Sequence, residues 1–483
     1  MSGAALAPVN EALAITGHPL QRAGAWAVAV MAGKESAAEV DAEALKLTAD
    51  RIVDDVCRAA TAPKGSAAYD WWKVLFALYP NSKATHSKRS GDASVLRPAI
   101  AEFFAAETLA AGGGRTCTFC GGAASVVWAK SNLPLFDSSK ALNTLPPGTP
   151  GWPVCQGCRV AIWALPYGAW VTAGSATVLS CEVEDAERAF AERNVRRARR
   201  VMQLGFDGVH RLEAGARPEL VALRAVRACR AELSASTLWT FKNDNQEPWL
   251  RVTSTRRAVP RFLAIVEGNA PLRRAWRLLE IWLTRRDKSG QVTGSGAGQA
   301  ARLLFESEDG SGASFLYQVY RMLSDPKRPW YLRDEHEVLR LALTYTKEIL
   351  GMEPDLHPVA ELIADWIQYG GGSPRGKWAE YYSVSQNGYR LGLLLHQAQN
   401  RLLLDGRNVA AGPDHWRAVI GQRTGAWEHR LLLSPTVSQL LAQRGVRFNT
   451  PVSEEEEQQV RQAVDQAMLA GDEDAYDEAN GPS

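Results

Sequence analysis

The chain has 483 residues, of which 46% are hydrophobic, and its formal net charge is +2. The apolar content excludes a largely disordered protein, and the length predicts two or three domains. The first 21 residues contain no Lys or Arg and the apolar run from Ala23 to Ala32 is short, so we expect a cytoplasmic protein without a secretory signal or membrane span.

The small net charge conceals a strong asymmetry along the chain. From Ser453 to the end there are ten acidic residues and one basic residue, Arg461. Since the whole chain carries +2 and this tail carries −9, the remainder carries about +11. A basic body favours a polyanionic partner such as nucleic acid.

The first part of the chain predicts a series of helices. Residues 20–60 have the apolar spacing of two helices, and residues 69–79 predict an aromatic-rich helix that stops at Pro80. A polar, basic loop follows over 81–90, and a further helix is predicted over 97–111.

The side chains of the loop are of types that reach base edges as well as phosphates. As candidate DNA contacts we single out Asn81, Ser82, Lys83, His86, Lys88 and Arg89. The alternative is an ordinary mobile surface loop.

Two Cys-x-x-Cys pairs come next, Cys117 with Cys120 and Cys155 with Cys158, and 34 residues separate them. Four thiolates from two tight turns complete the tetrahedral shell that a structural zinc prefers. A closed shell leaves no open position for substrate, so we predict that this metal builds structure. The alternative is two pairs of reduced, buried thiols.

The middle of the chain predicts mixed structure. β-branched and aromatic residues predict strands over 160–165 and 170–183, and residues 186–204 predict a helix with a very basic centre. Residues 237–241 and 249–253 predict the two strands of a β-hairpin.

Arginines recur through this middle region, and their planar fork suits phosphate. The candidate contacts are Arg193, Arg196, Arg197, Arg200, Arg256, Arg257, Arg273, Arg277 and Arg285. Helical spacing places Arg193, Arg196 and Arg200 on one face. For each cluster, an ordinary solvated surface is the alternative.

The predicted fold is mostly α, with a smaller α+β N-terminal and middle region, a zinc-bound four-cysteine insertion and a C-terminal helical bundle. We place an α+β domain over 1–290, with its zinc site at 117–158, and a Gly/Ser-rich linker region over 291–314. The helical bundle follows over 315–450, and an acidic helix with a loose tail over 451–483.

Motifs of catalysis are missing from the sequence. It has no P-loop, dinucleotide fingerprint, Gly-x-Ser-x-Gly elbow or His-Glu-x-x-His motif. We therefore expect no enzyme. Two other classes stay open: a zinc-ribbon nucleic-acid-binding protein, and a metal-dependent nuclease with a scattered site.

Three local features resemble one known family. They are the opening Thr16–Leu20 before the first apolar helix, the segment Leu75–Ser82 (LFALYPNS) with its Pro-Asn-Ser turn, and the two cysteine pairs. On these the chain resembles the large subunit of a type I CRISPR surveillance complex (Cascade), of the type I-B-like branch with a zinc-binding insertion. His18 and Arg22 stand where the family's pattern has Asn and Asp.

The resemblance implies a function. Such subunits sit at the foot of an RNA-guided complex, recognise a short motif (PAM) beside the target in duplex DNA, and help R-loop formation in antiviral defence. The implied partners are target duplex DNA, CRISPR guide RNA, the other Cascade subunits and a helicase–nuclease that such complexes recruit, with no membrane. The C-terminal bundle resembles the small subunit that lines the displaced strand.

Overall fold

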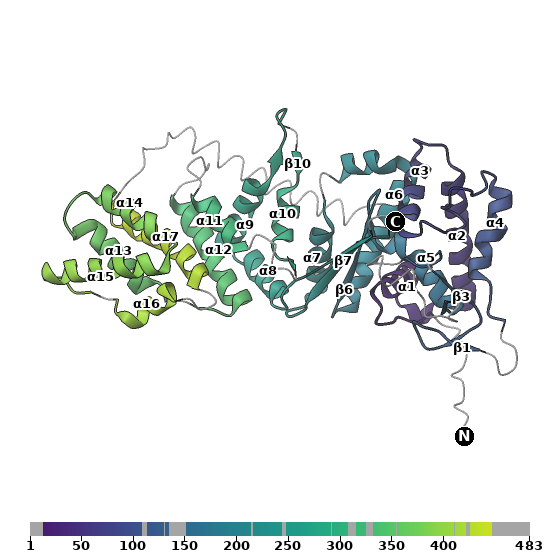
Figure 1. Cartoon of the computed structure of the whole chain (residues 1–483), viewed down its shortest axis with the longest axis horizontal. Helices are drawn as coiled ribbons and strands as arrows, with labels where there is room; N and C mark the ends of the chain where they lie inside the picture. Colours follow the sequence, from purple (N-terminus) through teal and green to yellow (C-terminus); the bar gives the residue numbers. More distant parts are fainter. Residues whose placement is uncertain are drawn as a thin grey trace, which may run out of the picture. The chain divides into compact units, whose positions relative to one another are not determined.

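The computed structural model describes residues 13–108, 114–129, 131–134, 151–213, 216–243, 248–290, 292–307, 315–324, 332–353, 355–409, 411–421 and 426–446. Within these ranges the chain forms seventeen α-helices and several small sheets (Figure 1), which confirms the predicted mostly helical fold. None of these helices is long and apolar enough to cross a membrane. The acidic helix and tail predicted over 451–483 lie outside the described residues.

The chain divides into two compact units. Unit 1 comprises Met1–Arg257 with Phe305–Gly310, and unit 2 comprises Ala258–Leu304 with Ser311–Ser483. The chain thus leaves unit 1 after Arg257, returns for one short strand, and leaves again. This boundary differs from the one predicted at residue 290.

The helices of unit 1 are α1 (Pro19–Met31), α2 (Ala42–Thr61), α3 (Ala67–Leu78), α4 (Ala93–Ala101), α5 (Gln156–Gly168), α6 (Glu184–Leu212) and α7 (Pro218–Ala228), with 3-10 turns at Ala37–Glu39 and Glu102–Phe104. Its strands are β1 (Arg115–Thr116), β2 (Ala123–Ala124), β3 (Val127–Trp128), β4 (Trp152–Pro153), β5 (Trp170–Val171), β6 (Ala176–Cys181), β7 (Ser236–Lys242), β8 (Trp249–Ser254) and β11 (Glu306–Ser307).

Side chains mark the starts of the early helices. Asp41 accepts a hydrogen bond from the Ala44 amide and so caps α2, and Ser66 accepts one from Tyr69 and caps α3. α1 begins at Pro19, whose fixed φ suits a first helical position. The two helices predicted over 20–60 and the aromatic helix before Pro80 are thereby confirmed.

Helix α5 is the centre of unit 1 and is buried from Cys158 to Gly168. It crosses α1 at close range, because a Cβ on Gly24 would lie 1.8 Å from the carbonyl oxygen of Ala161. The strand predicted over 160–165 is therefore wrong. A helix that is buried on all sides is apolar on all sides, so its sequence lacks the 3.6-residue period.

The helix predicted over 97–111 also differs from the structure. α4 begins earlier, after its cap Asp92, and ends at Ala101. In and just after the following 3-10 turn, the carbonyls of Phe103 and Ala105 accept hydrogen bonds from Arg159 and do not continue a helix.

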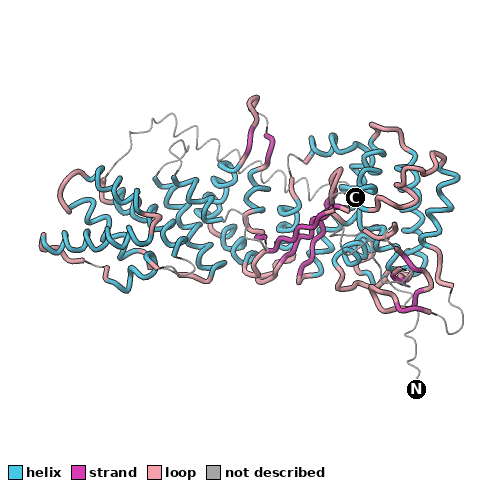
Figure 2. The backbone as a smooth tube through the Cα atoms, in the orientation of Figure 1, coloured by secondary structure: helices cyan, strands magenta, loops and turns pink. Residues whose placement is uncertain are grey.

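A five-stranded antiparallel sheet, drawn in magenta in Figure 2, has the order β11-β8-β7-β6-β5. Its central strand places Leu238 between Leu179 and Thr253. Ala176, Val178 and Phe241 belong to the same core as the N-terminal helices. The predicted hairpin of residues 237–241 and 249–253 is confirmed as β7 and β8.

The helices of unit 2 are α8 (Val259–Gly268), α9 (Ala270–Leu283), α10 (Gly296–Arg302), α11 (Phe315–Ser324), α12 (Leu332–Leu350), α13 (His357–Tyr369), α14 (Pro374–Val384), α15 (Gly388–Leu404), α16 (Pro413–Ile420) and α17 (Ala426–Gln443); its strands are β9 (Arg285–Arg286) and β10 (Val292–Gly294).

Unit 2 confirms the predicted helical C-terminal region. Rings of Phe262, Phe315 and Tyr345 meet in its core, the last two stacked with centroids 4.3 Å apart. Helix α13 packs against α15 and α17, and α12 packs against α9 and α17.

The segment predicted as a linker, 291–314, contains regular structure in its described part: β10, α10 and β11. Ser295 caps α10 by accepting from the Gly298 amide, and a Cβ on Gly296 would lie 1.7 Å from the carbonyl oxygen of Glu280. The small residues therefore let α10 pack tightly on α9. Composition alone does not separate this use of glycine from flexibility.

Candidate metal centre and nucleic-acid interface

The first cysteine pair lies in a tight turn between two short strands. β1 and β2 pair antiparallel, and the Cys117 amide donates to the Gly122 carbonyl at 2.7 Å across the turn. Gly121 has a φ of +77°, a left-handed conformation that glycine adopts without strain. Both Cys117 and Cys120 are thus presented from one turn.

The second pair lies where a strand becomes a helix. β4 pairs with β3, and Cys155 follows as the N-cap residue of α5. Cys158 lies in the first turn of that helix and is buried. The positive end of a helix dipole favours a nearby thiolate, so this position suits a metal ligand.

The two pairs meet in one group. All four sulfur atoms lie within 4.8 Å of one another, and the Cys120 and Cys155 sulfurs are 3.5 Å apart. A tetrahedral zinc with Zn–S bonds of about 2.3 Å would place its ligands about 3.8 Å apart. The described cysteines therefore stand at metal-binding distance.

Crowding perturbs the acidity of these thiols. Hydrogen bonds with Cys120, and then with Cys155 and Cys158, lower the pKa of Cys117, because three neighbours stabilise its thiolate. The pKa of Cys158 is raised by its interactions with the other three and by burial. A divalent cation would let all four bind as thiolates, since its charge offsets theirs.

Backbone amides support the sulfurs. The Gly122 amide donates to the Cys120 sulfur and the Cys155 amide to the Cys117 sulfur, each at 3.4 Å. Four sulfur ligands, with such amide donors behind them, fit zinc or a similar thiophilic ion.

Arg159 ties the metal centre to the preceding segment, a role that sequence reasoning missed. Its buried guanidinium donates to the carbonyls of Phe103 (2.9 Å) and Ala105 (2.8 Å) and to the Glu107 carboxylate (2.7 Å). The sequence did contain a signal for this role, because Arg159 is a charged residue at the start of an apolar run and directly follows Cys158.

The loop over 81–90 is an ordered chain of turns. The Ser82 amide donates to the Tyr79 carbonyl, and the Thr85 amide to the Ser82 carbonyl, each at 3.1 Å. The Tyr79 hydroxyl donates to the Ile162 carbonyl at 2.6 Å, and the Tyr79 ring stacks on Trp163. The LFALYPNS segment thus anchors the loop on α5.

The candidate residues of this loop divide into two groups. Ser82 is buried and its hydroxyl bonds to Thr85, so it lies in the interior and not on the surface. Arg89 donates to the Ala60 carbonyl at 2.9 Å and its guanidinium lies 4.4 Å from the Trp72 ring centre. These two side chains hold the loop in place.

The exposed members are Lys83, His86 and Lys88, while Asn81 is half-buried. Lys83 also forms an exposed ion pair with Glu102 at 2.7 Å. Such a pair contributes little and is readily exchanged for another anion.

The arginines of α6 divide in the same way. Arg196 and Arg200 are exposed and Arg193 is half-buried. Arg197 is 4% exposed, pairs with Glu213 at 2.8 Å and donates to the Val171 carbonyl. Arg197 is therefore removed from the candidate surface.

The remaining candidates lie beside carboxylates, on α9 or at the start of a hairpin. Arg256 pairs with Glu306 and Arg257 with Glu182, on the exposed surface of unit 1. In unit 2, Arg277 pairs with Glu280, whereas Arg273 and Arg285 are exposed. 

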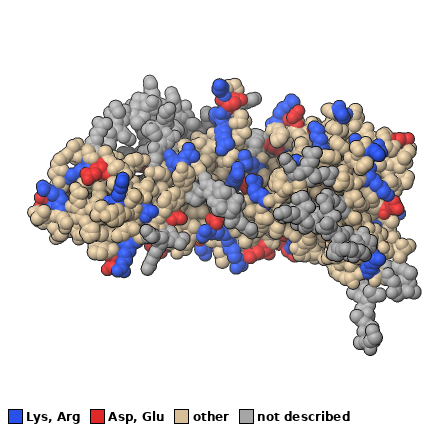
Figure 3. Space-filling model, viewed as in Figure 1, with Lys and Arg blue, Asp and Glu red and all other residues tan. Residues whose placement is uncertain are grey.

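Arg285 begins the β9–β10 hairpin, which projects from α9 and α10 in Figure 2. Arg285, Arg286 and Lys288 are all exposed, and Figure 3 shows Lys and Arg side chains along this hairpin. An exposed, basic β-ribbon of this kind can enter a nucleic-acid groove.

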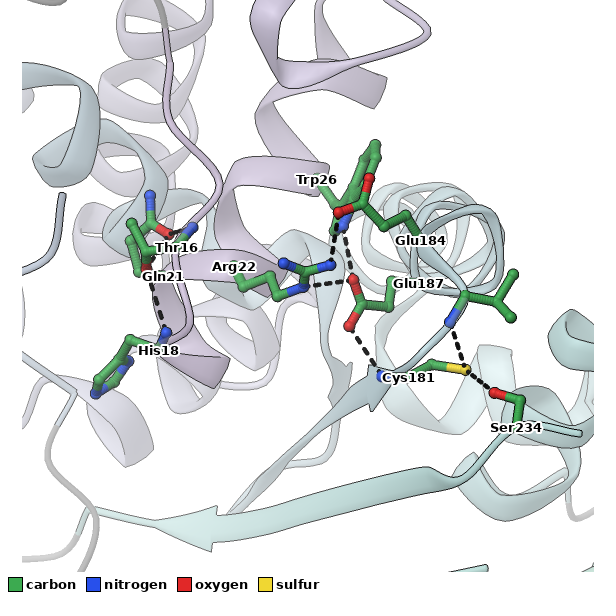
Figure 4. Close-up of polar contacts among 10 residues, drawn as sticks. Thr16, His18, Gln21, Arg22, Trp26, Cys181, Glu184, Glu187 and Ser234 are labelled. Carbon is green, nitrogen blue, oxygen red and sulfur yellow. Dashed lines mark hydrogen bonds and ion pairs between the residues drawn. The ribbon is translucent and has the colours of Figure 1, made fainter. Parts of the chain in front are cut away.

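Just after the opening motif, residues of α1 form a partly buried polar cluster with the start of α6, drawn in Figure 4. Arg22 pairs with Glu187 at 2.6 Å and with Glu184 at 3.1 Å, and the Trp26 indole donates to Glu187. Burial raises the pKa of Glu187, while Arg22 opposes that shift. Arg22 thus fastens α1 to the start of α6.

Across the described ranges, the cysteine quartet is the one group of three or more His, Cys, Asp or Glu side chains placed to hold a metal ion. Comparison with family models, curated proteins and solved structures finds no match to this chain.

Proposed function

We propose that this chain is a non-catalytic, cytoplasmic large subunit of an RNA-guided CRISPR Cascade complex that recognises a short motif in duplex DNA. One observation carries the proposal: the segment 79–88 combines side chains that anchor it in the interior with exposed Lys and His side chains. Tyr79, Ser82 and Thr85 are buried, whereas Lys83, His86 and Lys88 are exposed. A rigid loop with this division suits sequence recognition more than a mobile one does.

The exposed side chains have distinct roles in this proposal. Lys83 and Lys88 carry point charges that attract phosphate and steer the duplex to the loop. His86 offers a ring nitrogen to a base edge, and a short motif needs only a few such contacts. The guide RNA then reads the rest of the target by base pairing.

Zinc is the metal that we assign to the quartet. Bound there it would supply charge and a fixed tetrahedral geometry, and four protein ligands leave no position for catalysis. Its place at the start of α5 supports the loop indirectly, since Tyr79 rests on Ile162 and Trp163 of the same helix.

The exposed arginines favour nucleic acid as the partner over a protein. Arg196 and Arg200 in unit 1, and Arg285, Arg286 and Lys288 in unit 2, offer cations for phosphate contacts. In the proposed complex these contacts stabilise the opened duplex without adding sequence preference.

Replacement of Lys83, His86 and Lys88 by Ala in the full chain tests the proposal. Ser82 and Arg89 stay unchanged because they hold the loop. We expect the affinity for duplex DNA to fall about tenfold at moderate salt, since two phosphate contacts and one base contact are lost. Fluorescence anisotropy with duplexes that differ in the flanking motif measures this loss.

The matched control removes the same amount of positive charge elsewhere. Lys46→Ala with Arg417→Ala changes two exposed cations outside the candidate set, and we expect less than about a twofold effect on affinity. Equal losses in the two variants would show that the loop acts only through net charge. Unchanged affinity in the loop variant would remove the loop from the interface.

A further inference from the structure

Gln21 lies between the chain's opening segment and the metal centre. Its side chain is fully buried, and its amide nitrogen donates to the Ala14 carbonyl at 2.7 Å and to the Cys158 sulfur at 3.7 Å. Its amide oxygen accepts from the amide and the hydroxyl of Thr16, at 3.1 and 2.7 Å. Figure 4 shows the Gln21 and Thr16 side chains together.

Two further contacts join the same segment to the two cysteine turns. The His18 ring meets the Phe119 ring edge to face, with centroids 5.1 Å apart, and Phe119 lies between Cys117 and Cys120. Leu13 is buried, and its Cδ1 would lie 3.8 Å from a Cβ on Gly157, which stands between the second pair of cysteines. The opening segment therefore contacts both turns.

We propose that Gln21 is a positioning residue of the metal centre, and that residues 13–21 form the outer shell that metal binding orders. This inference rests on the metal proposed for the four cysteines, but not on any role in DNA recognition. Residues 13–18 precede α1 and contact both cysteine turns, so a fixed Cys158 sulfur and fixed turns help to determine where this part of the segment lies.

The chemistry supports this role. A metal-bound thiolate keeps negative charge on sulfur, and N–H donors stabilise that charge and orient the ligand. Cys120 and Cys117 receive backbone amides, whereas Cys158 receives the side-chain amide of Gln21. All the hydrogen-bonding positions of Gln21 are used, which fixes its amide in one orientation.

Gln21→Met tests the donor, because it keeps the length of the side chain and removes the N–H. We expect the metal affinity of the full chain, measured by competition with a chromogenic chelator, to fall about tenfold. With Co²⁺ in place of the native ion, we expect the sulfur-to-metal charge-transfer band to shift. A purely structural loss would lower occupancy but leave the band of the bound ion in place.

Thr16→Val is the matched control, since it removes a bond to the Gln21 oxygen and leaves the donor to Cys158. The Co²⁺ charge-transfer band of this variant should stay in place, and its metal affinity should remain within about twofold of that of the unsubstituted chain. Hydrogen exchange of the unsubstituted chain gives a test that needs no variant. Removal of metal should speed exchange at residues 16–21 and leave α13 in unit 2 unchanged.

Two results of these experiments would overturn the inference. One is a folded Gln21→Met chain with unshifted Co²⁺ bands and unaltered affinity. The other is equal exchange at residues 16–21 with and without metal. If Gln21→Met does not fold, the exchange result decides. A purified chain without bound metal would also overturn it, whereas failure to bind DNA would leave it standing.

Discussion

Arg197 and Arg196 are neighbours in the sequence, yet their surroundings give them different roles. Arg197 pairs with Glu213, donates to the Val171 carbonyl, and lies 4.0 Å from the Trp170 ring centre. Arg196 is exposed, and its ion pair with Glu192 on the same helix lies in solvent, where such a pair contributes little to stability. The first side chain holds the fold together, and the second is available to a partner.

This difference predicts opposite effects on stability. Arg197→Met should lower the free energy of unfolding by about 3–5 kcal/mol, because it leaves the Glu213 carboxylate, which is only 13% exposed, without its cationic partner. Arg196→Ala should change it by less than about 0.5 kcal/mol. Urea unfolding of the full chain, followed by tryptophan fluorescence and circular dichroism, measures both. Similar urea midpoints for the two variants would contradict the structural role of Arg197 and the surface role of Arg196.

At the scale of single residues, the sequence predicts what a side chain can bind better than it predicts whether that side chain is buried or exposed. The four cysteines are identified by their spacing alone, because two Cys-x-x-Cys pairs are a typical ligand set of a tetrahedral structural site. By contrast, Ser82 and Arg197 share the residue types of a binding surface but are buried. Their burial depends on contacts with more distant parts of the chain. Arg197 pairs with Glu213, 16 residues away. The Ser82 amide donates to the carbonyl of Tyr79, whose hydroxyl bonds to Ile162 of α5.

Helix α5 links three features that are separate in the sequence. Its N-terminus carries Cys155 and Cys158, its middle supports Tyr79, and its first turn contains Arg159, which fixes the segment before the cysteines. Sequence reasoning missed this helix because it is apolar on every side. The linker was mispredicted for a related reason: Gly296 serves close packing, which composition does not reveal.

Helix α6 is the element on which phosphate binding is most easily measured. Arg196→Ala with Arg200→Ala should reduce the slope of log affinity against log salt by about 1.8, because each lost phosphate contact releases about 0.9 fewer counterions. Preference among flanking motifs should stay the same, since these side chains contact backbone. A salt titration with two duplexes measures both quantities.

Glu192→Gln is a second control for this helix, and we expect it to change the affinity in the opposite direction. It removes the carboxylate that pairs with Arg196 at 2.7 Å, so binding at low salt should tighten. An unaltered slope in the double arginine variant, together with no gain from Glu192→Gln, would show that this face of α6 does not contact nucleic acid.

At the scale of the whole molecule, the candidate contacts are shared between two units. The loop over 81–90 and α6 belong to unit 1, whereas the β9–β10 hairpin belongs to unit 2. The chain connects the units more than once, because β11 returns to pair with β8. Sequence analysis predicted the helical C-terminal part, but not this return, which depends on a two-residue strand.

The proposed place in an RNA-guided complex is tested most directly by what copurifies with the full-length chain. We predict that the tagged chain, recovered from cells that express it with its neighbouring genes, carries a defined guide RNA and partner subunits in fixed ratio. RNA sequencing and mass spectrometry of the purified complex measure this. A chain that is recovered alone, or with nucleic acid of no defined sequence, would contradict the proposal and favour an independent zinc-ribbon nucleic-acid-binding protein.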